Sequence, residues 1–213
     1  MRAARRLAAI VGRADIPTIA LDKRLPVAAG IGGGSADAAA VIRLLCSRYG
    51  IAIDDPRVVM LAGELGADVP ACLASLPVRG DSRGDRLIAI EARALSGLPL
   101  LLVNPRVPLE TGPVFKAWDK TDRGPLMESH DPLTVACAGR NDLELPARAL
   151  CPIIGDVIGL LEAQPGVILA RMSGSGATCF ALFNHIEERD VAAAGITEDR
   201  PGWWRLATRL RQG

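Results

Sequence analysis

Apolar residues between positions 36 and 48 repeat with the period of an α-helix. They fall at the spacing i, i+3, i+4 and i+7, which places on one helix face Ala38, Val41, Ile42 and Leu45. Gly50 follows at the position where a left-handed C-terminal cap is common. The pattern therefore predicts an amphipathic helix over residues 36–48.

The same periodicities predict the other elements in chain order. Helices are expected at residues 3–11, 56–65, 113–119, 141–152, 155–164 and 186–194. Strands are expected at residues 16–26, 98–105, 167–171, 177–183 and 203–208, with short strands within 76–97. Asp55 and Pro56 supply an acidic cap and a first-turn proline for one of these helices. Residues 66–75 are expected to form a turn and an apolar stretch, and residues 121–133 a surface loop.

The second half of the chain follows the order strand, helices, strand, strand, helix, strand. This order is typical of an α+β layer arrangement, so the predicted fold class is α+β. We place the boundary near residue 95, which gives an N-terminal domain at 1–95 and a C-terminal domain at 96–213.

Four glycines stand directly before the helix predicted at 36–48: Gly30, Gly32, Gly33 and Gly34. A helix N-terminus has unpaired N–H groups and the positive end of the helix dipole, and both favour an anion. Glycine also lets the backbone approach a ligand closely. The segment therefore predicts phosphate binding, with a flexible turn that binds nothing as the alternative. Ser35 excludes the dinucleotide motif G-x-G-x-x-G, and the absence of a following lysine excludes the P-loop.

The composition indicates a globular protein and argues against nucleic acid as a partner. The 213 residues are 49% hydrophobic and 23% charged, with a net charge of +1 and 3% aromatic residues. A basic field and stacking platforms, which nucleic-acid binding requires, are therefore lacking.

Five cysteines without a C-x-x-C pair argue against a zinc cage or a disulfide framework and predict reduced thiols in the cytoplasm. No apolar stretch reaches the length of a membrane span. The opening MRAARRLAAIVGR is compatible with a transit peptide, but it favours a surface helix because alanine and arginine are strong helix formers.

Asp68 is the best candidate for acid or base chemistry, with a turn-stabilising aspartate as the alternative. A second glycine-rich loop lies between two predicted strands and consists of Ser173, Gly174, Ser175 and Gly176. It lacks the pattern of a nucleophile elbow, and a simple hairpin connection is its plainest interpretation. Asp142 and Glu144 fit helix-start acids, and Lys23 by itself fits a solvated lysine at a strand edge.

Taken together, these motifs resemble the GHMP small-molecule kinases. The segment PVAAGIGGGSADAA at 26–39 is similar to the second motif of that family. LGADVP at 65–70, VNPRVPLETGPVFKAWD at 103–119, GRNDLE at 139–144 and RMSGSGATCFALF at 171–183 follow in the family's order. The similarity runs from about Leu21 to residue 204. It is closest to the members that act on a cytidine-diphosphate-linked methylerythritol, in non-mevalonate isoprenoid synthesis.

The resemblance implies a two-domain GHMP-kinase-like fold with a ferredoxin-like C-terminal domain. It also implies transfer of a phosphoryl group from ATP, with Mg²⁺, to the 2-hydroxyl of this small-molecule substrate. Asp68 would take or orient the proton of that hydroxyl. The residues that would surround the ATP phosphates are Pro26, Val27, Ala28, Ala29, Gly30, Ile31, Gly32, Gly33, Gly34, Ser35 and Ala36.

Other residues are implied on the substrate side of the site. Lys23, Thr111 and Phe115 would line it, with Phe115 against the cytosine. The loop of Ser173, Gly174, Ser175 and Gly176 would complete the phosphate and substrate pocket. Ser35 is the nearest candidate for a magnesium contact. We further expect a monomer or weak homodimer with no membrane partner.

The chain also departs from the family pattern. Members begin with a further strand, a K-x-N-L-type motif and a G-Y-H segment, none of which stands upstream of residue 16. We therefore expect an incomplete N-terminal domain, a Met1 that is an internal start, and impaired activity of the chain by itself. Two alternatives stay open: a GHMP kinase for a sugar or homoserine, and a non-catalytic ATP-binding remnant.

Overall fold

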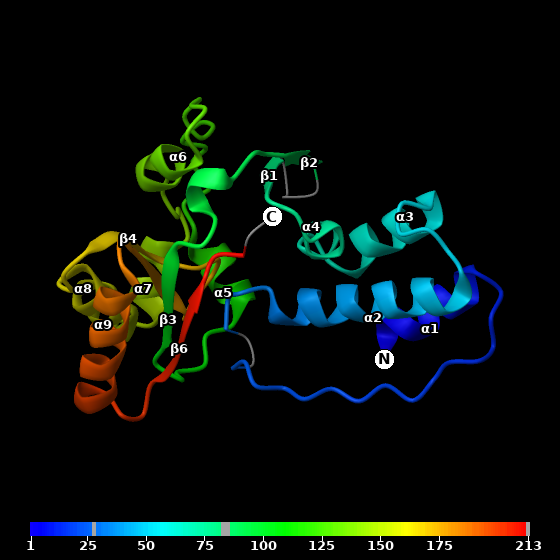
Figure 1. Ribbon diagram of the computed structural model, residues 1–213, viewed down its shortest axis with the longest axis horizontal. Coiled ribbons are helices and arrows are strands. Elements are labelled where there is room, and N and C mark those ends of the chain that lie inside the picture. Colours follow the sequence, from blue (N-terminus) through cyan, green and yellow to red (C-terminus); the bar gives the residue numbers. More distant parts are fainter. Residues whose placement is uncertain (27–28, 82–85, 212–213) are drawn as a thin grey trace. The chain divides into compact units, whose positions relative to one another are not determined.

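The computed structural model describes residues 1–26, 29–81 and 86–211, and its contacts divide the chain into two compact units (Figure 1). The first unit comprises Met1–Arg24 and Gly32–Glu91, and the second comprises Leu25–Ile31 and Ala92–Gly213. The short segment at 25–31 is thus part of the second unit although both its neighbours in sequence are part of the first. The domain limits 1–95 and 96–213 stay a prediction.

In its described residues the first unit is built from four helices and a hairpin. The helices are α1 (Arg2–Ile10), α2 (Gly33–Tyr49), α3 (Pro56–Leu65) and α4 (Val69–Ala74). The hairpin pairs β1 (Val78–Asp81) with β2 (Arg86–Ala89) in antiparallel register. The helices enclose a core whose largest fully buried side chains are Leu7, Ile42, Leu45, Val58 and Leu61. Burial of these apolar faces is what stabilises helices too short to persist alone.

The two ends of α2 are glycines in the left-handed region. Gly50 caps the C-terminus at φ 66°, and its N–H bonds the Ser47 carbonyl at 3.4 Å, which confirms the predicted cap. Gly32 caps the N-terminus at φ 64°. The helix therefore begins at Gly33, earlier than the predicted start at 36. Gly33 and Gly34 belong to its first turn. Glycine is a poor helix former but can adopt helical backbone angles, so the helix can begin within the glycine segment.

Helix α3 begins and ends where the sequence predicts. The Asp55 side chain accepts a hydrogen bond from the Arg57 N–H at 2.9 Å, and Pro56 occupies the first turn. The Arg57 guanidinium also donates to Asp55, at 2.7 Å from Nη2. These side-chain and backbone hydrogen bonds lower the pKa of Asp55 to about 2.

Two predictions for the first unit are corrected. Residues 16–24 and the described residues up to 26 form no strand, because an alternating apolar pattern becomes a strand only where a second strand supplies hydrogen bonds. Residues 69–74, expected as an unspecified apolar stretch, form the short helix α4. Its Pro70 lies in the first turn, where the missing N–H costs nothing.

The second unit contains a four-stranded antiparallel sheet in the order β4-β5-β3-β6. Its strands are β3 (Pro99–Asn104), β4 (Val167–Met172), β5 (Cys179–Phe183) and β6 (Trp204–Arg209). Helices α5 (Thr111–Ala117), α6 (Pro132–Ala138), α7 (Glu144–Leu150) and α8 (Ile153–Glu162) separate β3 from β4. Helix α9 (Ile186–Asp199) separates β5 from β6, and the 3-10 helix η1 (Arg93–Leu95) precedes β3. This is the ferredoxin-like β-α-β-β-α-β pattern, and it confirms the predicted α+β class.

Helices α8 and α9 cover one face of this sheet. Alternate strand residues point to that face, with Leu101 opposite Ala181 and Val103 opposite Cys179. They share one buried cluster with Ile154, Val157, Leu161, Ala192 and Ile196 of the two helices. In the described part of the chain no helix is long and apolar enough to cross a membrane.

Candidate functional site

The N-terminus of α2 is the first element of the site and lies in the first unit. Ala36 donates its N–H to the Gly32 carbonyl at 2.9 Å, so the intrahelical ladder begins at that residue. The N–H groups of the preceding turn have no intrahelical acceptor, as at any helix start. Gly33, Gly34 and Ser35 therefore present backbone donors, whereas the Ala36 N–H is already used.

Asp68 is brought to this helix start within the same unit. It occupies the N-cap position of α4, is exposed, and makes no side-chain capping bond. A Cβ placed on Gly32 would lie 3.9 Å from Asp68 Oδ2, so the carboxylate faces the glycine segment. The absent capping bond removes the main support for a turn-stabilising role. The geometry leaves a carboxylate beside backbone donors.

Arg43 holds α4 in place behind Asp68. It donates to the Cys72 carbonyl at 2.6 Å, one helical turn after Asp68. Burial, and to a smaller extent the Asp68 charge, raise the pKa of the Cys72 thiol. Both effects favour the neutral thiol of Cys72, which lies in the same short helix as the candidate base.

Lys23 is paired with Asp37, with Nζ 2.7 Å from Oδ2. Asp37 lies in the second turn of α2, and Lys23 lies two residues before the segment that belongs to the second unit. The ion pair therefore joins the chain just before and just after the glycine-rich segment. A contact between Lys23 and substrate stays a prediction.

In the second unit, Gly30 touches the loop of residues 173–176, called the 173–176 loop below. A Cβ on Gly30 would lie 2.4 Å from the Gly176 carbonyl oxygen and 2.7 Å from that of Ser173. Gly30 also has a φ of +72°, so both the backbone conformation and the lack of space for a Cβ require glycine. Ser173 Oγ donates to the Gly30 carbonyl at 3.0 Å, and the Thr178 N–H donates to the Ala29 carbonyl at 3.2 Å. Two glycine-rich segments far apart in sequence therefore meet by backbone contact, and a simple hairpin connection does not explain this loop.

Buried polar side chains surround the 173–176 loop. Asn104, Ser175 and Thr178 are each less than 9% exposed. Asn104 donates from Nδ2 to Thr178 Oγ1 at 2.9 Å, and the hydroxyls of Thr111 and Ser175 share a hydrogen bond at 3.0 Å. Buried polar groups are retained only where they are hydrogen-bonded, so this cluster fixes the loop.

Phe115 and Thr111, both predicted on the substrate side, belong to α5. Phe115, on α5, is 49% exposed, which suits a ring offered to a ligand. Thr111 begins α5 and joins it to the 173–176 loop. Ile31 is half-buried, Pro26 precedes the segment, and Val27 and Ala28 lie outside the described residues.

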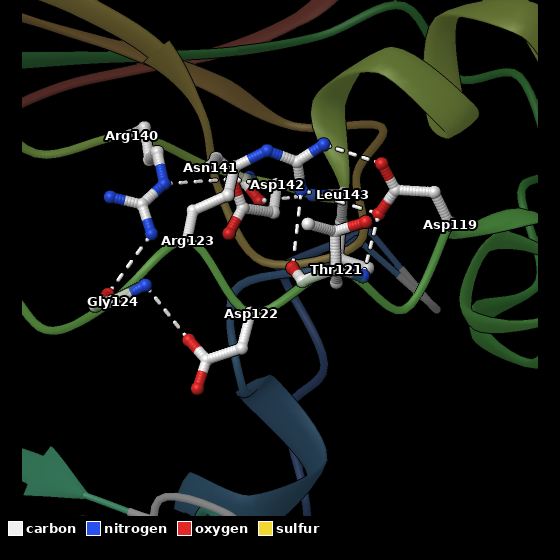
Figure 2. Close-up of polar contacts among 9 residues, drawn as sticks. All are labelled: Asp119, Thr121, Asp122, Arg123, Gly124, Arg140, Asn141, Asp142 and Leu143. Carbon is white, nitrogen blue, oxygen red and sulfur yellow. Dashed lines mark hydrogen bonds and ion pairs between the residues drawn. The ribbon is translucent and has the colours of Figure 1, made fainter.

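Sequence reasoning missed Asn141, which bonds the 173–176 loop directly. Asn141 Nδ2 lies 2.9 Å from the Met172 carbonyl oxygen and 2.8 Å from that of Gly174. Glu144 is a first-turn acid of α7 as expected, but Asp142 is paired with Arg140 and Arg123 (Figure 2). The two carbonyls that Asn141 bonds are 31 and 33 positions away in sequence, and no local pattern reveals them.

The donor set suits magnesium only together with phosphate. In residues 1–26, 29–81 and 86–211, no group of three or more His, Cys, Asp or Glu side chains could hold a metal ion. Mg²⁺ is usually held by one or two carboxylates or hydroxyls and by substrate phosphates rather than by a protein cage. Ser35 and the exposed Asp68 fit that minimal set.

Family models match both halves of the chain. The model described as GHMP kinases N terminal domain matches residues 1–75, and the model described as GHMP kinases C terminal matches residues 121–199. A 4-diphosphocytidyl-2-C-methyl-D-erythritol kinase of Rhizorhabdus wittichii is 67% identical over 99% of this chain and 72% of its own length. The kinase of the same name from Sphingopyxis alaskensis is 49% identical over 96% of this chain and 73% of its own length.

Solved structures agree with the sequence matches. The crystal structure of a 4-(cytidine 5'-diphospho)-2C-methyl-D-erythritol kinase matches with a TM-score of 0.79 and 32% identity, over 100% of this chain and 77% of that chain. A homoserine kinase from Cytophaga hutchinsonii matches with a TM-score of 0.70 and 18% identity, over 99% of this chain and 76% of that chain, which shows the fold alone. These matches confirm the fold that the resemblance implied.

Proposed function

The chain belongs to the GHMP kinases, and on that premise we propose that it transfers a phosphoryl group from ATP to the 2-hydroxyl of 4-diphosphocytidyl-2-C-methyl-D-erythritol. The observation that carries the proposal is the backbone contact between Gly30 and the 173–176 loop. It joins two glycine-rich segments that offer N–H donors to phosphate groups. The substrate is proposed from the relatives, of which one bearing that kinase name is 67% identical.

Asp68 is proposed to accept the proton of the substrate hydroxyl. As the oxygen attacks the terminal phosphorus of ATP, the bond from that phosphorus to the bridging oxygen breaks and ADP leaves. The proton passes to Asp68, which is exposed and faces the glycine segment at Gly32. Phosphoryl transfer depends mainly on positioning and on stabilising charge, so one carboxylate and many backbone donors suffice.

The proposed ATP-phosphate contacts are the described residues of the segment 26–36. Gly33, Gly34 and Ser35 offer N–H groups without an intrahelical acceptor. Mg²⁺ bound with the phosphates would neutralise charge there beside the Ser35 hydroxyl. Lys23, Thr111 and Phe115 are proposed on the alcohol side. The reaction is proposed to occur in the cytoplasm, in line with five cysteines that are all free thiols.

Two other functions differ from this one in testable ways. A kinase for a sugar or homoserine would share both glycine-rich loops, but the segment VNPRVPLETGPVFKAWD and the NDLE motif favour the cytidine-linked substrate. A non-catalytic remnant would bind ATP without releasing ADP. Offering each alcohol separately to the chain with ATP and Mg²⁺ distinguishes them.

The deciding experiment is a coupled ADP-release assay on the 213-residue chain with Asp68→Asn as the test variant. Loss of a general base lowers turnover by about 10²–10⁴-fold. Asp54→Asn is the matched control, because Asp54 is also an exposed aspartate of the first unit. Turnover that survives Asp68→Asn would overturn the proposed role. ATP binding measured by calorimetry without ADP release, for every alcohol, would favour the remnant.

A further inference from the structure

Asn141 uses three of its hydrogen-bonding positions on the main chain. Its Nδ2 donates to the carbonyls of Met172 and Gly174, at 2.9 and 2.8 Å. Its Oδ1 accepts from the Leu143 N–H at 3.0 Å. An amide supplies two N–H donors on one nitrogen, so Asn141 can hold two carbonyls at once, which no carboxylate can do.

The residues beside Asn141 are tied to a second loop (Figure 2). Arg140 donates from Nε to Asp142 at 3.0 Å and from Nη2 to the Gly124 carbonyl at 3.0 Å. Arg123 donates to Asp119 and lies 3.8 Å from Asp142. The chain on both sides of Asn141 is therefore fixed by charged pairs, and the three hydrogen bonds of the amide fix its direction.

The two carbonyls that Asn141 holds determine where nearby N–H groups point. In a trans peptide the C=O and the following N–H point in opposite directions. Fixing the Met172 carbonyl turns the Ser173 N–H the other way, and that N–H bonds the Thr178 carbonyl at 2.9 Å. Fixing the Gly174 carbonyl in the same manner turns the Ser175 N–H away from Asn141.

The Ser175 N–H has no acceptor among the described residues, although Ser175 is only 6% exposed. A donor left unpaired at such burial costs free energy unless a ligand or water completes it. The same loop contacts Gly30 of the first glycine-rich segment through Ser173 Oγ. The donor that Asn141 orients thus belongs to the loop that meets the other glycine-rich segment.

We infer that Asn141 is a positioning residue that aims the Ser175 N–H at a phosphate group. The inference rests on the proposed function for its ligand, which is a phosphate of ATP or the diphosphate of the alcohol substrate. Asn141 acts through the 173–176 loop and touches neither.

The first test is amide hydrogen exchange on the ligand-free chain, resolved for Gly176 and Thr178. Their N–H groups bond the Ser173 and Ala29 carbonyls at 2.9 and 3.2 Å. In Asn141→Ala their exchange should rise about tenfold, because two carbonyls lose their donor. Asn184→Ala is the matched control, since Asn184 is exposed and follows β5. Unchanged exchange in Asn141→Ala, or a rise of equal size across β4 and β5, would overturn the inference.

The second test is the dissociation constant of each ligand, measured separately by calorimetry. Asn141→Ala should weaken binding of ATP, of the cytidine-diphosphate alcohol or of both by about tenfold, with Asn184→Ala unchanged. The ligand that Asn141→Ala binds more weakly than the wild type is the one whose phosphate contacts the 173–176 loop. Wild-type affinity for both ligands in Asn141→Ala would overturn the inference.

A third variant keeps the inference testable if Asn141→Ala does not fold. Asn141→Ser retains one hydroxyl donor and should give a smaller change of the same kind, whereas no change would overturn the inference. If the wild-type chain binds neither ligand, the proposed function and the phosphate role of Asn141 both fail. If the wild type binds and Asn141→Ala binds equally well, Asn141 alone is wrongly assigned.

Discussion

The polar groups of the candidate site are arranged differently in the two units. In the first unit Asp68 is exposed, makes no capping bond, and faces a glycine with open space around it. In the second unit Ser175 and Thr178 are buried, and their hydroxyls are hydrogen-bonded. An exposed side chain without hydrogen bonds can change its partners during a reaction. A buried, hydrogen-bonded side chain is held in one position. The difference agrees with the proposed roles, in which Asp68 takes a proton and the 173–176 loop places a ligand.

The glycines show the same difference. A Cβ added to Gly34 would meet nothing within 4 Å. Glycine at this position therefore leaves the backbone of the helix start accessible. A Cβ added to Gly30 or to Gly174 would lie within 2.7 Å of a backbone oxygen. Glycine at these positions therefore allows two chain segments to approach closely. Gly34 in the first unit leaves space in which a ligand can approach the backbone. Gly30 and Gly174 in the second unit allow contact between two segments of the same chain.

The largest effect is expected for Gly30→Ala. The Cβ would meet the Gly176 carbonyl oxygen at 2.4 Å, and φ is +72°, so both contact and backbone strain oppose it. Unfolding free energy of the second unit should fall by about 2–4 kcal/mol. All three tryptophans, Trp118, Trp203 and Trp204, lie in that unit, so urea denaturation followed by tryptophan fluorescence measures it.

Gly195→Ala is the matched control for that measurement. Gly195 lies within α9 of the same unit, with nothing within 4 Å of an added Cβ. Alanine should therefore stabilise the unit by about 0.5–1 kcal/mol. Equal effects of the two substitutions would contradict the close approach at Gly30.

A middle-sized effect is expected for Asn104→Ala, which tests the buried bonds of the second unit. Asn104 is 4% exposed, donates to Thr178 Oγ1, and accepts from the Arg106 N–H at 2.7 Å. Its removal leaves buried partners unsatisfied and should cost about 1–3 kcal/mol. The same fluorescence titration measures the loss, and Asn184→Ala should leave the midpoint unchanged. A neutral Asn104→Ala would mean that this cluster does not fix the loop.

The smallest effect is expected for Asp55→Asn in the first unit. The variant keeps a capping oxygen and removes only the charge that pairs with Arg57. Because the folded pKa of Asp55 is about 2, below its ordinary value of 3.8, the charge stabilises the folded state above about pH 4. That contribution is lost as the pH falls through 2. Thermal unfolding followed by circular dichroism should show a small wild-type advantage at pH 7 that vanishes near pH 2, and a constant difference would refute the charge effect.

Local signals in the sequence predict much of the fold. Helix α3 follows from Asp55, Pro56 and Gly66, because caps and breakers act within a few residues. Strands β3 and β5 follow from apolar runs whose residues are mostly buried. The segment at 16–26 fails because its pattern is that of a strand but strand formation depends on a partner.

The candidate site is predicted only in part, and the reason is sequence distance. Asp68 and both glycine-rich loops are visible as motifs, although Asp68 facing Gly32 and Gly30 touching the 173–176 loop are properties of the fold. Asn141 stands within the GRNDLE motif, but its bonds to two carbonyls cannot be predicted from the sequence, because carbonyls carry no side-chain signature. The site assignments other than these placements stay predictions.

The residence of residues 25–31 in the second unit has a consequence for synthesis on the ribosome. The bond from Ser173 Oγ to the Gly30 carbonyl spans 143 positions. At about 5–20 residues per second, Gly30 leaves the peptidyl-transferase centre roughly 7 to 29 s before Ser173 is joined to the chain. Helices α2 to α8 and strands β1 to β4 are translated in that interval. The glycine segment is therefore flanked by a forming unit well before its partner, 143 positions later, is translated.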